Sequence, residues 1–296
     1  MASSKQDIRR LNPGIQVNDI YVGAASRVNS RLVAETSMVS PSAPGSVMTP
    51  RSITGIDFDG SNEYLTLATN SDFDFDYNDP FSLSAWVNWT NTSQDTIIGK
   101  MVTGGTYRGW SLDVKSRSVV FYLISTWTSN TIKVTGNCGI IDAFSWHNIV
   151  VTYDGSTNAS GITVYFNSAD IGSLTIDIDS LGSNSTTNSE AVLIGQRNSQ
   201  GYFDGNLSNV SVWNKELSVA EVVDVWNYGR VPNLLQHSAV SNLVAWWQCG
   251  TGDDGAGTDD STDSSDASAR IYDMSANSHN MTPVNTEAAD IKSVVG

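Results

Sequence analysis

Short segments of alternating apolar and polar residues fill the chain from residue 53 onward, and they constrain the fold more than any other feature. Gly, Asn, Asp and Ser separate them, and they recur roughly every 10 to 15 residues. A period of two is typical of antiparallel strands that bury one face. In the clearest segment, the side chains expected on one face are Phe81, Leu83, Ala85, Val87 and Trp89. The pattern predicts an all-β, two-sheet antiparallel sandwich.

Residues 218–229 are the one stretch with a convincing helical pattern. Ser218 can cap the first turn, Glu221 completes a capping box and Gly229 is a typical stop. We expect one short helix there. Its predicted apolar face consists of Val219, Val222, Val223 and Trp226.

The segment "SNLVAWWQCG", residues 241–250, has the composition of a buried strand, although an acidic run of small residues follows it. Each large apolar side chain gains about 1.5 to 3 kcal/mol from full burial. This strand therefore needs a sheet that the residues directly after it cannot supply.

Residues 1–50 differ from the rest of the chain. They hold four of the seven prolines and carry five basic against three acidic residues. Their apolar residues are too sparse for a core, so we expect an extended arm that binds a neighbouring chain. The residues expected to make that contact are Arg9, Arg10, Ile15, Val17, Ile20, Tyr21, Val22, Arg27 and Arg31.

Charge and hydropathy exclude some functions. The formal net charge is −15, and it becomes −17 when the basic arm is left out. Such a body repels phosphate backbones, so nucleic acid is not expected as the main partner. No apolar run reaches the roughly 18 residues of a membrane span, and "MASSKQDIRR" lacks the apolar region of a signal peptide. We expect no membrane insertion and no export by the usual route.

Four stretches, "GIDFDGSNEYLTL", "FSLSAWVNW", "WHNIVVTYDG" and "GYFDGNLSNVSVWNKELSVAEV", resemble successive landmarks of the laminin-G-like, concanavalin A-like jelly-roll superfamily. The resemblance implies a jelly roll over residues 51–296. In this family a strand similar to "NLVAWW" usually opens the domain, so residues 241–290 are expected to supply a permuted terminal strand. The alternative is the start of a second, truncated copy.

The resemblance also implies a calcium site, since family members often hold Ca²⁺ at the sandwich rim. The candidate ligands are Asp59, Asn62 and Glu63 in the "FDGSNE" turn, with Asp273. A tight turn at Asp59 and Gly60 without a metal explains the same residues.

Aromatic residues near expected loop ends are candidates for stacking on a sugar. They are Tyr107, Trp110, Tyr122 and Trp127. Because alternation sends about half of a strand's rings inward, most of them are expected in the core.

Catalysis is the weaker interpretation, and we expect no catalytic residues. The laminarinase-type hydrolases of this fold carry a motif similar to Glu-x-Asp-x-x-Glu, which the sequence lacks. The acidic stretch "DFDFDY", residues 72–77, is better explained as a rim strand whose rings cover the core. The three histidines lie in no recognisable nucleophile motif.

An extended arm before an acidic jelly roll is typical of a domain tethered to a larger assembly, and bacteriophage structural proteins often display such domains. We therefore expect a non-enzymatic virion decoration protein, with other capsid or tail proteins, copies of itself and a host-surface glycan as partners. The alternatives are a free, calcium-dependent lectin-like module and, less favoured, a laminarinase-type glycoside hydrolase.

Overall fold

The computed structural model describes residues 53–89, 92–139, 145–197, 200–250, 270–287 and 290–294. They belong to one compact unit, Thr49–Gly296. The predicted arm, with all nine of its contact residues, and the acidic run after residue 250 lie outside the described residues.

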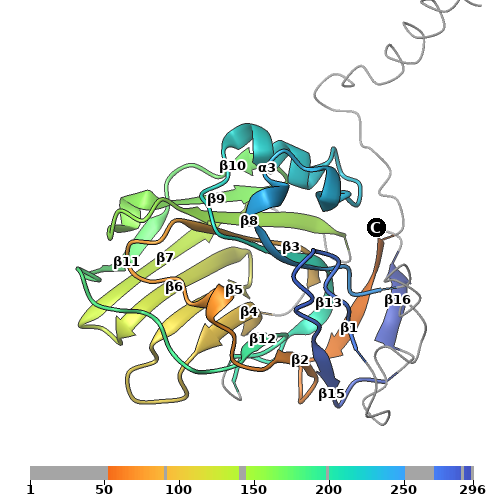
Figure 1. Ribbon diagram of the computed structural model, residues 1–296, viewed down its shortest axis with the longest axis horizontal. Coiled ribbons are helices and arrows are strands. Elements are labelled where there is room, and N and C mark those ends of the chain that lie inside the picture. Colours follow the sequence, from red (N-terminus) through yellow and green to blue (C-terminus); the bar gives the residue numbers. More distant parts are fainter. Residues whose placement is uncertain are drawn as a thin grey trace, which may run out of the picture. The chain divides into compact units, whose positions relative to one another are not determined.

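Two antiparallel sheets form the two layers of the protein, which confirms the predicted sandwich (Figure 1). The first sheet has the order β10 (Ala169–Asp170), β9 (Ile162–Phe166), β8 (His147–Tyr153), β3 (Phe81–Trp89), β13 (Asp204–Trp213), β1 (Ile53–Asp59) and β16 (Ile291–Val294), and β14 (Leu243–Trp247) also pairs with β13. The second sheet has the order β11 (Thr175–Asp179), β7 (Asn130–Asn137), β6 (Ser118–Thr126), β5 (Gly109–Lys115), β4 (Gln94–Met101), β12 (Val192–Ile194), β2 (Tyr64–Leu67) and β15 (Thr282–Val284).

The main core lies between the sheets. In β3, Phe81, Leu83 and Val87 belong to this core, as the alternation predicts. The other face of β3 is buried too. Helix α3 (Val219–Trp226) and the residues after it form a second apolar cluster with strands of the first sheet, so this sheet is covered on both faces.

Strand β13 is the partner that the "NLVAWW" segment requires. The first half of β13 pairs with β1, and its second half pairs with β14 in the register Val210↔Trp247. Trp247 is fully buried in the main core, where its indole Nε1 donates to the carbonyl of His279 at 2.8 Å. Trp246 is buried on the opposite face, beside α3.

The C-terminal end of the described chain supplies one strand to each sheet. β15 pairs with β2, and β16 pairs with β1 in the register Ile53↔Val294. Both sheets therefore contain strands from widely separated parts of the sequence.

Helix α3 differs in two details from the prediction. The capping box of Ser218 and Glu221 is present. The helix ends earlier than Gly229, however, because Asn227 adopts the left-handed conformation with φ of 47° and Asn tolerates that region. Val225 is buried in place of Val219, which is 62% exposed.

The acidic stretch at residues 72–77 is not a strand. Ser71–Phe73 form a turn of 3₁₀ helix, and the Asn70 side chain accepts from the backbone N–H of Asp72. Phe73 and Phe75 still enter the core, as predicted, because a turn can direct both rings inward.

None of the helices in the described part of the chain combines the length and the apolar character needed to cross a membrane.

Candidate functional site

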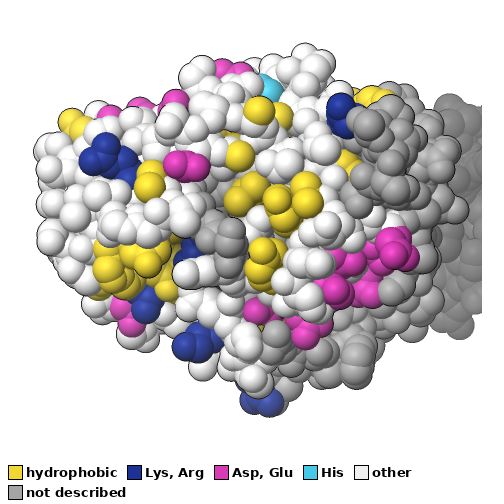
Figure 2. Space-filling view, turned by 90° about the horizontal axis from the view of Figure 1, so that it is seen from below, with side chains coloured by type: hydrophobic (Ala, Val, Ile, Leu, Met, Phe, Trp, Pro, Cys, Tyr) yellow, Lys and Arg dark blue, Asp and Glu magenta, His cyan; other side chains and the backbone are white. Residues whose placement is uncertain are grey.

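A pocket of about 220 Å³ lies on the outer face of the second sheet. Figure 2 views the protein from the lower side of Figure 1, where this sheet lies, and shows hydrophobic side chains in groups with lysine or arginine nearby. The lining residues are Gln94, Met101, Tyr107, Tyr122, Ile124, Trp127, Arg197 and Gln200. Three of the four aromatic residues predicted to bind a sugar are among them.

Alternation along β6 produces the floor of this pocket. Phe121 and Leu123 point into the main core, whereas Tyr122 and Ile124 belong to a separate cluster with Met101 of β4. Successive side chains of a strand point to opposite faces. The strand that fills the core therefore also places the Tyr122 ring on the outer face of the sheet, where it is 6% exposed.

Two turns between strands provide the walls. Tyr107 lies in the β4–β5 turn and has a left-handed φ of 52°. Trp127 follows β6, and its backbone N–H donates to the carbonyl of Thr106 at 2.8 Å. This hydrogen bond joins the two turns and fixes Tyr107 and Trp127 on one side of the pocket.

The three rings pack edge to face or tilted. The ring centroids of Trp127 and Tyr107 are 6.2 Å apart at 69°, and those of Trp127 and Tyr122 are 6.1 Å apart at 48°. The edge-to-face arrangement of Trp127 and Tyr107 is one that aromatic pairs favour. Trp127 is 37% exposed, so an indole with supporting neighbours is accessible to a ligand.

Polar groups surround Tyr122. Gln94 Nε2 donates to the Tyr122 hydroxyl at 2.9 Å and to Asp113 Oδ2 at 2.6 Å. Arg197 Nη1 lies 2.8 Å from the same carboxylate oxygen, and the guanidinium lies 5.2 Å from the centroid of the Tyr122 ring. The pocket therefore combines an apolar floor with fixed hydrogen-bonding groups, a composition common in small-molecule sites.

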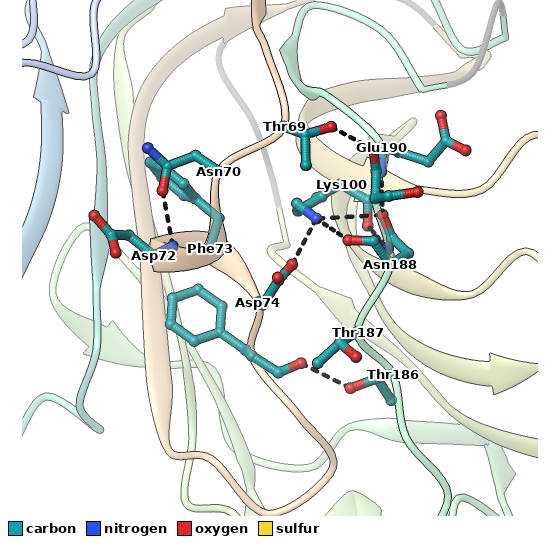
Figure 3. A network of polar contacts seen from close by, with 12 residues as sticks. Thr69, Asn70, Asp72, Phe73, Asp74, Lys100, Thr186, Thr187, Asn188 and Glu190 are labelled. Carbon is teal, nitrogen blue, oxygen red and sulfur yellow. Dashed lines mark hydrogen bonds and ion pairs between the residues drawn. The ribbon is translucent and has the colours of Figure 1, made fainter.

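A buried lysine that no sequence motif indicated holds together the loops beside this site (Figure 3). Lys100 is 1% exposed, and its Nζ donates to Asp74 Oδ1 at 2.6 Å and to the carbonyl of Asn188. Asn188 Nδ2 in turn donates to the carbonyls of Lys100 and Arg108 at 3.2 and 3.1 Å. These bonds hold the base of the turn that carries Tyr107.

The fourth predicted aromatic residue, Trp110, is a core residue, and the prediction of sugar contact for it is wrong. Its side chain is 1% exposed, and its Nε1 donates to the carbonyl of Phe73 at 3.0 Å. Trp110 is in phase with Leu112 and Val114, which also point into the core.

The predicted calcium ligands Asp59, Asn62 and Glu63 form one compact turn. Asp59 Oδ1 accepts from the N–H of Ser61 at 2.7 Å and from that of Asn62 at 3.4 Å. Glu63 Oε2 accepts from the N–H of Asp59 at 2.7 Å. Burial raises the pKa of Glu63 from 4.5 to about 7, although that backbone hydrogen bond lowers it. Asp290 and other nearby carboxylates raise it further.

Asp273 is used in a different way. Oδ1 accepts from the backbone of Trp246 at 2.9 Å, and Oδ2 accepts from that of His279, also at 2.9 Å. It thus joins β14 to the segment after the acidic run. Within the described residues, no three acidic, histidine or cysteine side chains gather in one place, and the carboxylates of Asp59, Glu63 and Asp273 already accept backbone N–H groups. Calcium binding stays a prediction.

Two solved structures compare with the fold. A Bacteroides ovatus protein described as carbohydrate-binding has a TM-score of 0.54 at 14% identity, over 84% of this chain and 61% of that one. The chain therefore spans about three fifths of that protein's length. A pentraxin from Limulus polyphemus has a TM-score of 0.43 at 15% identity, over 63% and 88% of the two chains.

Sequence comparison gives the family. No curated protein matches the chain. Residues 59–223, more than half of the chain, match the family model described as the concanavalin A-like lectin/glucanases superfamily. The matched range runs from the end of β1 into α3 and includes every described residue of the pocket. The chain therefore belongs to the concanavalin A-like lectin/glucanases superfamily.

Proposed function

We propose that the protein is a non-catalytic, glycan-binding jelly roll, and that the pocket around Trp127 is its binding site. The observation that carries the proposal is the convergence of Tyr107, Tyr122 and Trp127 on one hollow with Gln94 and Arg197 at its side. The resemblance of the fold to the Bacteroides ovatus protein described as carbohydrate-binding agrees with this function.

The chemistry of a sugar matches this lining. A pyranose ring has apolar C–H faces that pack on an aromatic ring, and hydroxyl groups that need donors and acceptors at its edge. Trp127 offers the exposed face, while Gln200 offers an amide. The rings are held by neighbouring side chains and by the bond between the two turns, so little order has to be gained on binding.

The charge arrangement supports binding rather than hydrolysis. Glycoside hydrolysis uses two carboxyl groups that flank the scissile bond. In the described part of the chain, the pocket lining includes neither Asp nor Glu, and the nearby carboxylate of Asp113 is buried against Arg197.

Binding of the full chain to a panel of immobilised neutral and acidic oligosaccharides tests the proposal. We expect Trp127→Ala to weaken binding at least about tenfold, the effect of removing an aromatic anchor. Tyr228→Ala is the matched control, since Tyr228 is 56% exposed and does not line the pocket. Equal loss in both variants, or no binding to any glycan, would refute this function.

We further propose that this domain serves on a virion, anchored by residues 1–50. The sequence supports the idea through the basic, proline-rich composition of that segment beside an acidic domain. Assembly onto the particle would take place in the host cytoplasm. Mass spectrometry and electron microscopy of purified particles test whether the protein is a virion component. A chain recovered only free of particles would favour the lectin-like alternative.

A further inference from the structure

The charge of the pocket, taken with its size, points to one class of ligand. Building on the proposed glycan function, we propose that Asp113 determines selectivity by neutralising Arg197, so that the pocket accepts a single uncharged sugar ring and discriminates against acidic sugars.

Size limits the ligand to about one ring. The pocket has a volume of about 220 Å³, below the roughly 300 to 1,000 Å³ of cavities that enclose drug-sized ligands. Trp127 and Tyr107 wall one side, and Tyr122 closes the floor. A longer glycan would therefore place one residue in the pocket and the rest along the surface.

Among the described residues that line the pocket, Arg197 is the one with a charged side chain, and the carboxylate of Asp113 neutralises that charge. The Asp113 side chain is fully buried, and its Oδ2 lies 2.8 Å from Arg197 Nη1. Gln94 Nε2 donates to the same oxygen at 2.6 Å. Arg108, on the nearby β4–β5 turn, donates through Nε to the carbonyl of Ser125 and does not line the pocket.

The ion pair resists exchange with an acidic ligand. A sugar carboxylate that displaced Asp113 from Arg197 would leave a buried carboxylate without its cation, and one that bound the remaining N–H groups would meet a guanidinium whose charge Asp113 already balances. Removing one partner of a buried pair is strongly unfavourable. Lys133, 5.8 Å from the Tyr122 ring centroid, is also paired, with Asp177 at 3.5 Å.

The neutralised site still offers hydrogen bonds to hydroxyl groups. The Tyr122 hydroxyl oxygen accepts from Gln94 at 2.9 Å, and a phenol has one proton to donate in addition. A guanidinium has five N–H donors. Asp113 contacts Arg197 through Nη1, so the guanidinium has further N–H groups that can donate to a sugar hydroxyl. The formal net charge of −15 adds a general repulsion of anionic ligands.

Calorimetric titration of the full chain with matched pairs of methyl hexosides and methyl hexuronides, in the gluco and galacto series, tests the inference. Each pair differs only in whether C6 is a hydroxymethyl group or a carboxylate. We expect the neutral ring to bind at least about tenfold more tightly, a difference of about 1.4 kcal/mol. Its dissociation constant should change less than about twofold between 20 and 500 mM NaCl, because a neutral ligand is not screened.

Asp113→Asn is the diagnostic variant, because it removes the compensating charge and keeps the shape. It should narrow the preference for the neutral ring by about tenfold or reverse it. A wild-type chain that binds the hexuronide equally well or better would overturn the inference while leaving glycan binding intact, as would a folded Asp113→Asn variant with an unchanged ratio. If Asp113→Asn does not fold, the wild-type ratio and its salt dependence decide the matter. If neither ring of any pair binds, the inference fails, and the oligosaccharide panel decides whether the proposed function fails with it.

Discussion

Trp247→Ala measures how far β14 belongs to the sandwich core. Trp247 is fully buried, its ring stacks on Phe73 with centroids 6.1 Å apart, and its Nε1 donates to the carbonyl of His279. Truncating a buried tryptophan to alanine costs about 3 to 5 kcal/mol. The carbonyl of His279 also loses its donor, which adds about 1 kcal/mol or more.

We therefore expect the free energy of unfolding to fall by about 4 to 6 kcal/mol, out of the roughly 5 to 15 kcal/mol typical of a domain. Equilibrium urea denaturation followed by far-UV circular dichroism measures this loss. Trp247→Phe keeps most of the stacking and removes the donor, so it should cost about 1 to 3 kcal/mol.

Trp127→Ala is the matched control for the same assay. Trp127 is 37% exposed, so its truncation should change the free energy of unfolding by less than about 1 kcal/mol. If Trp247→Ala stays within about 1 kcal/mol of the wild type, β14 is not part of the cooperative core, and the segment that contains it folds as a separate unit.

Three further predictions concern pH, metal and the N-terminal segment. Because the folded-state pKa of Glu63 is raised to about 7, its contribution to stability is present below its usual pKa and is lost as pH rises through 7, so the melting temperature should fall between pH 5 and 8. Glu63→Gln should remove that part of the pH profile, and equal slopes in both proteins would contradict the assignment. If calcium binds the turn at residues 59–63, an excess of about 100 times the dissociation constant adds about 2.7 kcal/mol, whereas equal melting temperatures in calcium and EDTA would leave these acids as turn formers. A chain that begins at Thr49 should melt within a few degrees of the full chain yet fail to join the particle, and normal assembly of the shortened chain would disprove the tether.

Sequence alternation predicted the sandwich because most of its strands bury one face in the main core. In "FSLSAWVNW" the side chains at odd-numbered positions were predicted to share one face, and in the structure they all lie in the main core. The same rule places Trp110 in phase with Leu112 and so in the core, whereas the prediction of a sugar contact relied on its position near a loop end.

The features of the site that could not be predicted from the sequence depend on contacts between residues that are distant in the chain. Lys100 lies near the end of β4, and only the fold brings it to Asp74 and Asn188. The pocket depends on two turns joined by the bond from Trp127 to Thr106. The aromatic residues of the pocket can be listed from the sequence, but neither periodicity nor spacing shows that they lie next to one another in the fold.

The pairing of β16 with β1 and of β15 with β2 has a consequence for how the protein is made. During synthesis, the edges of both sheets are available long before residues 282–294 leave the ribosome. Pairings of such high contact order form slowly, and unpaired edges of a nascent chain are prone to aggregation. We expect the sandwich to close only after residues 282–294 have left the ribosome, so the yield of soluble protein should depend on the rate of synthesis and on chaperones more than the stability of the finished domain would suggest.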